Sequence, residues 1–182
     1  YMEDIAAELA SQGKKAMIIP VGGSNSIGAL GYIKGAVEIV EQLDEKRINL
    51  DYVISPTSSG GTQTGILLGF KLLKPEIKAI GIGVGDPRQE LLEDVVGLIK
   101  DTAVSLGVDE KIIPKEELEE KTIDGYGFGN YGSIVQEVID LIRYVARKEG
   151  FYLDPVYTGK AFYGLIDMIK KGIIPKNSRV LF

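Results

Sequence analysis

The chain has 182 residues, of which 45% are hydrophobic and 26% are charged, a balance typical of a globular domain with a sizeable core. Its formal net charge of -5 argues against nucleic-acid binding, and no apolar stretch is long enough to span a membrane. The absence of Cys and His excludes disulfides, thiolate chemistry, imidazole bases and the common zinc sites. We therefore expect a small-molecule partner, no metal site and a cytoplasmic location, with proton transfer left to Tyr, Lys, Asp, Glu or Ser.

The first part of the chain alternates between helical and strand-like patterns. Residues 2–12 have helical periodicity, and the apolar residues of 14–20 predict a short strand. A helix over 27–43 follows, with Ser26 as its N-cap, and the β-branched residues of 51–55 predict a buried parallel strand. This order favours strands that are each followed by a helix.

The second part of the chain repeats that order. Strands are predicted at 78–84, which is apolar on both faces, and at 122–123 and 179–182. The helices expected there are 87–106, begun by Asp86 and Pro87, a short acidic helix before residue 120, 133–148, and 160–171. Strands alternating with helices predict an α/β fold with a doubly wound, mostly parallel sheet, in three layers with helices on both faces.

The candidate site is the loop 58–62 (SSGGT), which joins the strand at 51–55 to an apolar helix. Its small residues let a ligand approach the backbone, and the unpaired N–H groups of the helix start favour a phosphate. The loop matches neither G-x-x-x-x-G-K-[ST] nor G-x-G-x-x-G, which favours a small phosphorylated ligand over a nucleotide. A helix start that binds no ligand is the alternative interpretation. The loops 21–26 and 124–132 are expected at the same sheet edge, although the glycines of 21–26 are also explained as turn residues.

Four motifs resemble the family of D-cysteine desulfhydrase and 1-aminocyclopropane-1-carboxylate deaminase, pyridoxal-phosphate enzymes of the tryptophan-synthase-β-like fold type II. They are PVGGSNSIGALGY (20–32), SSGGTQTG (58–65), YGFGNYG (126–132) and LDPVYTGKAFYGL (153–165), in the family's order over nearly the whole chain. The resemblance implies the cofactor pyridoxal 5'-phosphate, with its phosphate held by Ser58, Ser59, Gly60, Gly61 and Thr62. It also implies a small amino-acid substrate and a homodimer.

The resemblance also assigns roles on the substrate side of the cofactor. Tyr157 and Tyr131 are expected to be catalytic, and a tyrosine with a lowered pKa can exchange a proton near a cationic centre. The alternative is that both are half-buried aromatic residues that close a pocket; on sequence pattern alone this is the favoured interpretation of Tyr131, and the resemblance reverses it. Thr158 is expected to meet the pyridine nitrogen, where a hydroxyl can donate to a neutral ring and leaves a weaker electron sink than a carboxylate. This favours elimination of a good leaving group over ring opening.

Three functions follow as hypotheses. The first is a lyase that converts D-cysteine, or a related D-amino acid, to pyruvate, ammonia and sulfide. The second is a 1-aminocyclopropane-1-carboxylate deaminase. The third is a non-catalytic domain that binds a phosphorylated ligand, which shares the 58–62 loop but gives no reason for the segment 153–165.

The chain departs from the family in two features. The family's cofactor-bearing lysine lies in an Asn-Lys-x-Arg-like context that no lysine here has, and Lys160 is better explained as part of a helix. The family's terminal His-Thr-Gly-Gly is also absent. We therefore expect 1–182 to be a single cofactor-cradling domain of a two-domain enzyme, without its N-terminal lysine-bearing part and its C-terminal turn, and inactive by itself.

Overall fold

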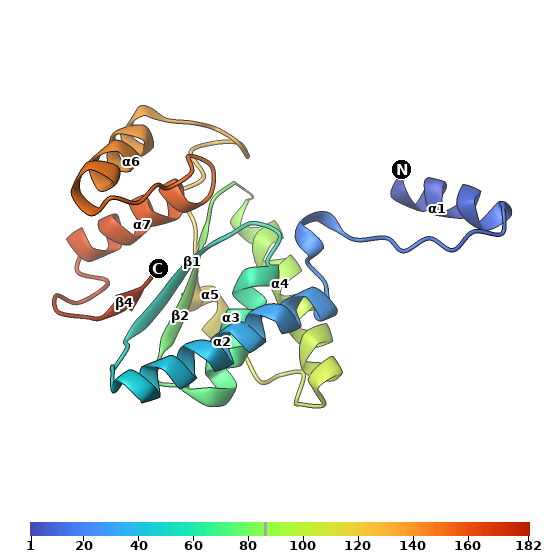
Figure 1. Ribbon diagram of the computed structural model, residues 1–182, viewed down its shortest axis with the longest axis horizontal. Helices are drawn as coiled ribbons and strands as arrows, with labels where there is room; N and C mark the ends of the chain where they lie inside the picture. Colours follow the sequence, from blue (N-terminus) through green and yellow to red (C-terminus); the bar gives the residue numbers. More distant parts are fainter. Residues whose placement is uncertain (86) are drawn as a thin grey trace.

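The computed structural model describes residues 1–85 and 87–182 and contains a parallel, four-stranded sheet (Figure 1). The strand order is β3-β2-β1-β4. The strands are β1 (Tyr52–Thr57), β2 (Lys78–Gly83), β3 (Thr122–Ile123) and β4 (Val180–Leu181). The two central strands pair over six residues each, from Tyr52 with Lys78 to Thr57 with Gly83. The predicted parallel α/β sheet is therefore confirmed.

Helices lie on both sides of this sheet. The helical segments of the described residues are α1 (Met2–Ser11), the 3-10 turn η1 (Val21–Gly23), α2 (Ser26–Lys46), α3 (Gly61–Leu73), α4 (Arg88–Leu106), α5 (Lys115–Lys121), α6 (Gln136–Glu149) and α7 (Thr158–Lys170). Figure 1 shows α6 and α7 on one side of the strands and α2 to α5 on the other. The predicted three-layer arrangement is confirmed as well.

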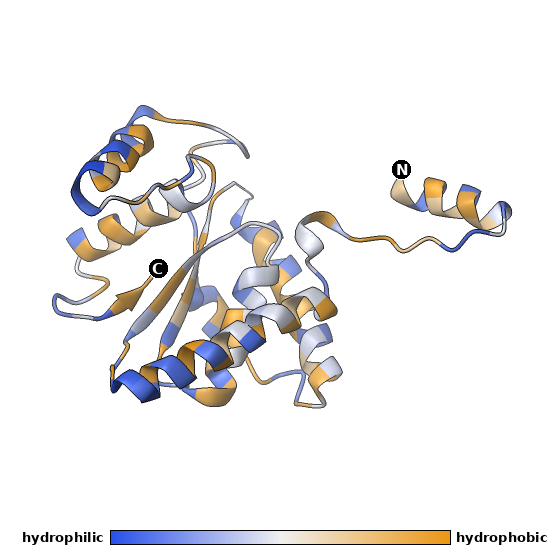
Figure 2. Ribbon diagram, viewed as in Figure 1, coloured by the Kyte–Doolittle hydropathy of each residue, from blue (hydrophilic) through white to orange (hydrophobic). Residues whose placement is uncertain are grey.

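Two buried clusters hold the layers together. One joins β1 and β2 to α2, α3, α4 and α5, and includes Val53, Leu68, Phe70 and Val95. The other joins the opposite face of the sheet to α7 through residues such as Ile54, Ile82 and Met168. Figure 2 shows hydrophobic and hydrophilic residues alternating along the helices, as expected of helices with one buried face. Both faces of the central strands are thus covered, which explains their continuous apolar runs.

The N-terminal segment differs from what the sequence predicts. The prediction of a strand at 14–20 is wrong. These residues are extended but belong to no sheet of the described residues (Figure 1), and Met17 is 80% exposed. A strand needs a neighbour to satisfy its N–H and C=O groups, and none of the described strands pairs with this segment. The preceding α1 buries no residue, and Figure 1 shows it apart from the sheet and its helices.

Smaller corrections concern helix ends. The N-cap of α2 is Asn25 and not Ser26, because the Asn25 side chain accepts a hydrogen bond of 2.7 Å from the Gly28 N–H. The start predicted for α4 involved Asp86, which lies outside the described residues.

Within residues 1–85 and 87–182, none of the helices combines the length and apolar character that a membrane span requires.

Candidate functional site

The candidate site lies at the edge of the sheet where the parallel strands end. β1 ends at Thr57, β2 at Gly83 and β3 at Ile123, so the loops that follow them leave from the same edge. Such an edge is where ligands of parallel α/β sheets bind. The structure therefore brings together the predicted loops 58–62 and 124–132.

The loop before α3 is built from glycines that no other residue can replace without strain. Gly60 has a left-handed backbone (φ 80°), and a Cβ on it would lie 2.8 Å from Val95 Cγ2. A Cβ on Gly61 would lie 2.7 Å from Ser24 Oγ. Both approaches are closer than a side chain tolerates, and the left-handed conformation costs a non-glycine residue about 1–3 kcal/mol. The two glycines thus let other parts of the chain approach the helix start.

Ser24 is a residue of this loop system that the sequence analysis did not single out. Its hydroxyl donates a 2.7 Å hydrogen bond to Ser59 Oγ and accepts one of 3.2 Å from the Gly61 N–H. The loop 21–26 therefore flanks the 58–62 loop, as one of the two interpretations held. The signal was its Gly/Ser composition, which did not say which hydroxyl would make the contact.

The remaining donors at the start of α3 fit a phosphate. Within the described residues, the N–H groups of Ser59, Gly60, Thr62 and Gln63 make no turn bond to a carbonyl, and Gly60 provides no side-chain cap. Thr57 Oγ1 and Thr64 Oγ1, on either side of the loop, are buried and have no partner there. Buried polar groups are rarely left unpaired, so an anion that accepts from this loop suits the donors present.

Tyr131 and Tyr157 come together although they lie far apart in the sequence. Their hydroxyls are in hydrogen-bonding contact, and their rings meet edge to face with centroids 5.9 Å apart. Tyr131 also packs on the end of β2, because a Cβ on Gly85 would lie 3.1 Å from the Tyr131 Cα. Both rings are partly exposed, 58% for Tyr131 and 38% for Tyr157, so a ligand at the sheet edge can reach them.

Lys160 links α7 and the loop of Tyr131 to the sheet; together with Tyr131 and Tyr157, these form the tyrosine side of the site. Its side chain is fully buried, and its ammonium donates hydrogen bonds to the carbonyls of Val84 (2.9 Å) and Gly127 (2.7 Å). Burial lowers the pKa of Lys160. The side chain thereby joins α7 to the end of β2 and to the loop that carries Tyr131, which agrees with its predicted structural role.

A second hydrogen bond to α7 comes from Tyr126, the neighbour of Gly127 in the same loop. The Tyr126 hydroxyl donates a 2.7 Å hydrogen bond to Asp167 on α7, and Asp167 pairs with Lys171 at 2.6 Å. Burial and the interactions with Asp167 raise the pKa of Tyr126 to about 12. A tyrosine held in its protonated form is a steady donor, so Tyr126 anchors the loop and is unsuited to exchange protons.

Thr158 is the first residue of α7, and its hydroxyl lies against Asp154. It lies 2.5 Å from Asp154 Oδ2 and accepts a 2.8 Å hydrogen bond from the Asp154 N–H. Because Lys160, two residues further along α7, reaches the end of β2, this helix start lies at the same sheet edge as the 58–62 loop. The role predicted for Thr158 at a ring nitrogen stays a prediction, and Asp154 is a partner that the sequence analysis missed.

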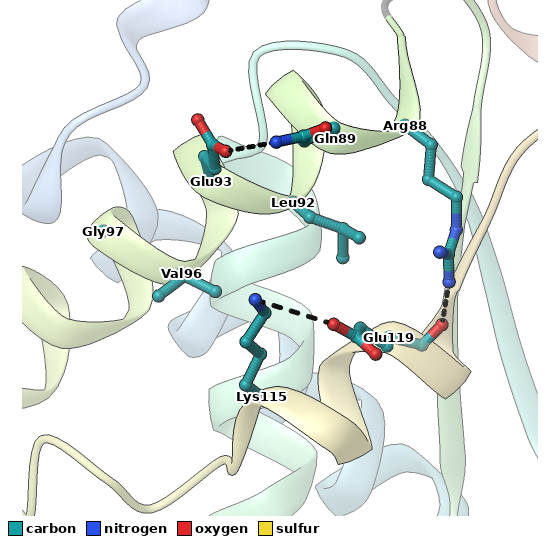
Figure 3. Close-up of a pocket in the computed structure, with 8 residues that line it drawn as sticks. All are labelled: Arg88, Gln89, Leu92, Glu93, Val96, Gly97, Lys115 and Glu119. Atoms are coloured by element: carbon teal, nitrogen blue, oxygen red, sulfur yellow. Dashed lines mark hydrogen bonds and ion pairs between the residues drawn. The ribbon is translucent and has the colours of Figure 1, made fainter.

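A larger cavity, of about 590 Å³, lies between α4 and α5. Figure 3 shows that its polar side chains turn to one another: Lys115 pairs with Glu119 at 3.8 Å, and Arg88 donates to the Glu119 carbonyl at 2.9 Å. A smaller one, of about 390 Å³, adjoins Tyr131 and Gly85. A further cavity, of about 470 Å³, adjoins Ser24 and Ser59. We place the site at the sheet edge, where these two cavities adjoin the predicted loops, because the cavity between α4 and α5 is lined by none of the predicted site residues.

Comparisons with known proteins agree with this geometry. The profile of the family described as "Pyridoxal-phosphate dependent enzyme" matches residues 1–182. A provisionally named 1-aminocyclopropane-1-carboxylate deaminase from Pyrococcus furiosus is 43% identical over the whole chain, which covers 53% of that protein. A D-cysteine desulfhydrase from Serratia proteamaculans is 36% identical, again over the whole chain and 53% of its own length. The chain thus spans about half the length of these curated relatives.

Solved structures give the same picture. A crystal structure of an ACC deaminase homologue matches 99% of this chain and 52% of its own, with a TM-score of 0.87 and 40% identity. A crystal structure of a threonine deaminase matches 99% of this chain and 69% of its own, with a TM-score of 0.55 and 17% identity. The second likeness shows the fold alone. The fold is that of fold-type-II pyridoxal-phosphate enzymes, as the sequence predicted.

Proposed function

The chain belongs to the family of pyridoxal-phosphate dependent enzymes, and from this premise we propose that the whole protein is a lyase acting on D-cysteine or a related D-amino acid with a β-leaving group. The products would be pyruvate, ammonia and sulfide. Family membership confirms the resemblance of the motifs and, with it, pyridoxal 5'-phosphate as the cofactor. The homodimer, the cytoplasmic location and the single cofactor-cradling domain stay predictions.

The residues of this chain would divide the work between two sides of the cofactor. When bound, pyridoxal 5'-phosphate supplies an electron sink for the bonds at the substrate α-carbon. Ser58 to Thr62 would hold its phosphate, through the backbone donors of the loop and the Thr62 hydroxyl. Thr158 would face the ring nitrogen from the start of α7. The orphan hydroxyls of Thr57 and Thr64 support a polar ligand at this end of the sheet.

The observation that carries the proposal is the contact between the Tyr131 and Tyr157 hydroxyls at this edge. In such a pair one hydroxyl donates to the other, and the accepting tyrosine keeps its own proton for a further partner. The pair can therefore hold a proton next to the substrate and pass it on, in a chain that has no histidine. Lys160 keeps the Tyr131 loop against the sheet and so maintains the contact.

A second candidate is a 1-aminocyclopropane-1-carboxylate deaminase. It is favoured by the Pyrococcus relatives of that provisional name, at 41–44% identity, against 36% for the desulfhydrase. The hydroxyl of Thr158, in place of a carboxylate, supports the desulfhydrase. We therefore keep the desulfhydrase as the proposal and the deaminase as its competitor.

An assay of the full-length protein with three substrates distinguishes the two candidates. We expect pyruvate from D-cysteine and less from L-cysteine. Ammonia from 1-aminocyclopropane-1-carboxylate, without pyruvate from either cysteine, would favour the deaminase. A protein without visible cofactor absorbance would instead favour a non-catalytic phosphate-binding domain.

The phosphate assignment has its own variant. Thr62→Ala should weaken cofactor binding, measured as loss of the cofactor absorbance on dilution. Ser105→Ala is the matched control, because Ser105 is an exposed hydroxyl on α4 whose bond goes to the Asp101 carbonyl. Equal retention of the cofactor by both variants would remove Thr62 from the site.

A further inference from the structure

The hydroxyl of Thr158 has its hydrogen-bonding capacity almost filled by Asp154. A hydroxyl carries one proton and two lone pairs. The proton goes to Asp154 Oδ2, 2.5 Å away, and one lone pair accepts from the Asp154 N–H at 2.8 Å. What remains is a single lone pair, so Thr158 can offer a further partner an acceptor but no donor.

Asp154 is held in the ionised form that this arrangement needs. Its carboxylate accepts hydrogen bonds of 2.7–2.8 Å from the backbone N–H groups of Val156, Tyr157 and Thr158. Partial burial raises the pKa of Asp154, but the bonds from the Thr158 hydroxyl and from these N–H groups outweigh it and lower the pKa on balance. A carboxylate without its own proton has only acceptor capacity toward the Thr158 hydroxyl.

We propose that Asp154 is a positioning residue that fixes Thr158 as a hydrogen-bond acceptor, so that the cofactor ring nitrogen binds opposite Thr158 in its protonated form. An unprotonated ring nitrogen is an acceptor too, and two acceptors in contact repel each other. A protonated nitrogen donates to the free lone pair, and the Asp154 charge behind the hydroxyl stabilises it further. The inference rests on the proposed contact between Thr158 and the ring nitrogen.

The other titratable groups at this end of α7 face elsewhere within the described residues. The Lys160 ammonium donates to the carbonyls of Val84 and Gly127, and the Tyr157 hydroxyl meets Tyr131. Asp154 is thus the charged group that bonds the Thr158 hydroxyl. A helix cap alone requires the bonds from the backbone N–H groups, whereas the bond from the hydroxyl adds nothing to that role.

This arrangement changes the expectation for the chemistry. A threonine at the ring nitrogen was expected to donate to a neutral ring and to leave a weak electron sink. With Asp154 behind it, Thr158 acts in the manner of a carboxylate, since it accepts from a protonated ring and favours a strong sink. Thr158 therefore distinguishes a desulfhydrase from a deaminase less clearly when Asp154 is taken into account than when Thr158 is considered without it.

The test is a nitrogen NMR measurement on the full-length protein, loaded with pyridoxal 5'-phosphate that carries ¹⁵N in its ring. At neutral pH we expect the ring signal of the wild type at the position of a protonated pyridine. In Asp154→Asn we expect the amide NH₂ at the position of Oδ2, beside Thr158, because it faces one backbone N–H there, that of Thr158, whereas at the position of Oδ1 it would face two, those of Val156 and Tyr157. The hydroxyl is then free to donate, and the signal should move to the unprotonated position.

Two further variants separate the possible failures. Asp140→Asn, an exposed carboxylate on α6 that pairs with Arg143, should leave the ring signal unchanged. Thr158→Val should also move the signal, and a signal that ignores Thr158→Val would remove the proposed contact itself. A wild-type signal at the unprotonated position, or an Asp154→Asn signal that stays protonated while Thr158→Val moves it, would overturn the role of Asp154 and leave the proposed function standing. If Asp154→Asn does not fold, the wild-type signal still tests the proposal, because a ring at the unprotonated position overturns it.

Discussion

The anion-facing loop 58–62 is built from backbone and glycine, whereas the tyrosine side of the site is held by side chains from distant parts of the chain. Gly60 and Gly61 shape the loop within a few residues of the strand that precedes it. The tyrosine side depends on Lys160, Tyr126 and the contact between two tyrosines 26 residues apart. The first side thus depends mainly on local backbone geometry, to which Ser24 adds a distant contact, and the second on tertiary packing. Mutations on the two sides should fail in different ways.

The largest effect is expected on the tyrosine side. Tyr157→Phe and Tyr131→Phe should each lower kcat of the full-length enzyme about 10²–10⁴-fold, the range for losing a positioned acid or base. Because the two hydroxyls form one proton path, the double variant should be little worse than either single one. Tyr152→Phe, at a ring that is 88% exposed, is the control. Full activity in both single variants would show that the pair has no part in the chemistry.

On the loop side, Gly60→Ala should destabilise the fold by about 1–3 kcal/mol and weaken cofactor binding, because a side chain there is strained and meets Val95. Gly97→Ala is a control that should change the free energy of unfolding in the opposite direction. Gly97 is exposed in the middle of α4 with nothing within 4 Å of its Cβ position, so the change should stabilise by about 0.5–1 kcal/mol. Denaturant unfolding measures both, and equal effects would contradict the strained geometry at Gly60.

Lys160→Met tests the tie between the tyrosine side and the sheet. It leaves the Val84 and Gly127 carbonyls without their donor while removing a buried cation, for a net loss of about 1–2 kcal/mol. Lys170→Met, at an exposed position of the same helix, should cost much less. A kcat reduced more than the stability loss explains, through a displaced Tyr131, would sharpen the contrast between the sides.

The pH dependence of Lys160→Met has a definite sign. Burial lowers the pKa of Lys160, so between its folded pKa and its ordinary value the unfolded chain binds more protons than the folded one. The stability of the wild type should therefore rise with pH across that window relative to Lys160→Met. Denaturant unfolding at several alkaline pH values measures the difference, and a difference that shrinks with pH would contradict a buried cation.

Asp154→Asn should have the smallest effect on stability, about 1 kcal/mol, as for other residues that cap a helix start. The hydrogen bonds at Asp154 lower its pKa, so its contribution is present above the pKa of the unfolded chain and is lost as the pH falls through the folded value. Thermal unfolding at neutral and acidic pH should show the wild type and Asp154→Asn converging in acid. A gap independent of pH would mean that the carboxylate charge is not involved.

The contrast between the two sides also explains what the sequence could predict. The strands, the helices and the 58–62 loop follow from local patterns, because periodicity and glycine position act within a few residues. The strand expected at 14–20 failed because strand formation depends on a neighbour that no local pattern reveals. A run of apolar residues predicts the tendency to extend, and pairing decides the rest.

The contacts of the tyrosine side lie beyond local patterns for the same reason. Lys160 shares a helical stripe with the buried residues Gly164 and Met168, and this spacing was a signal that its charge would be buried. Asp154 lies two and three residues before Val156 and Tyr157, a range in which Asp side chains often accept from backbone N–H groups, but its contact with the Thr158 hydroxyl, four residues on, does not follow from that pattern. That the hydroxyls of Tyr131 and Tyr157 meet depends on how α7 packs against the sheet, which only the folded chain shows.

The measurement that tests the account most directly is a crystal structure of the full-length protein with pyridoxal 5'-phosphate. The account predicts the phosphate at the start of α3, with backbone N–H groups of Ser59 to Thr62 about 2.7–3.2 Å from its oxygens. It also predicts the ring between that loop and the pair formed by Tyr131 and Tyr157. A phosphate bound elsewhere, such as in the cavity between α4 and α5, or a ring on the opposite edge of the sheet, would contradict the central claim.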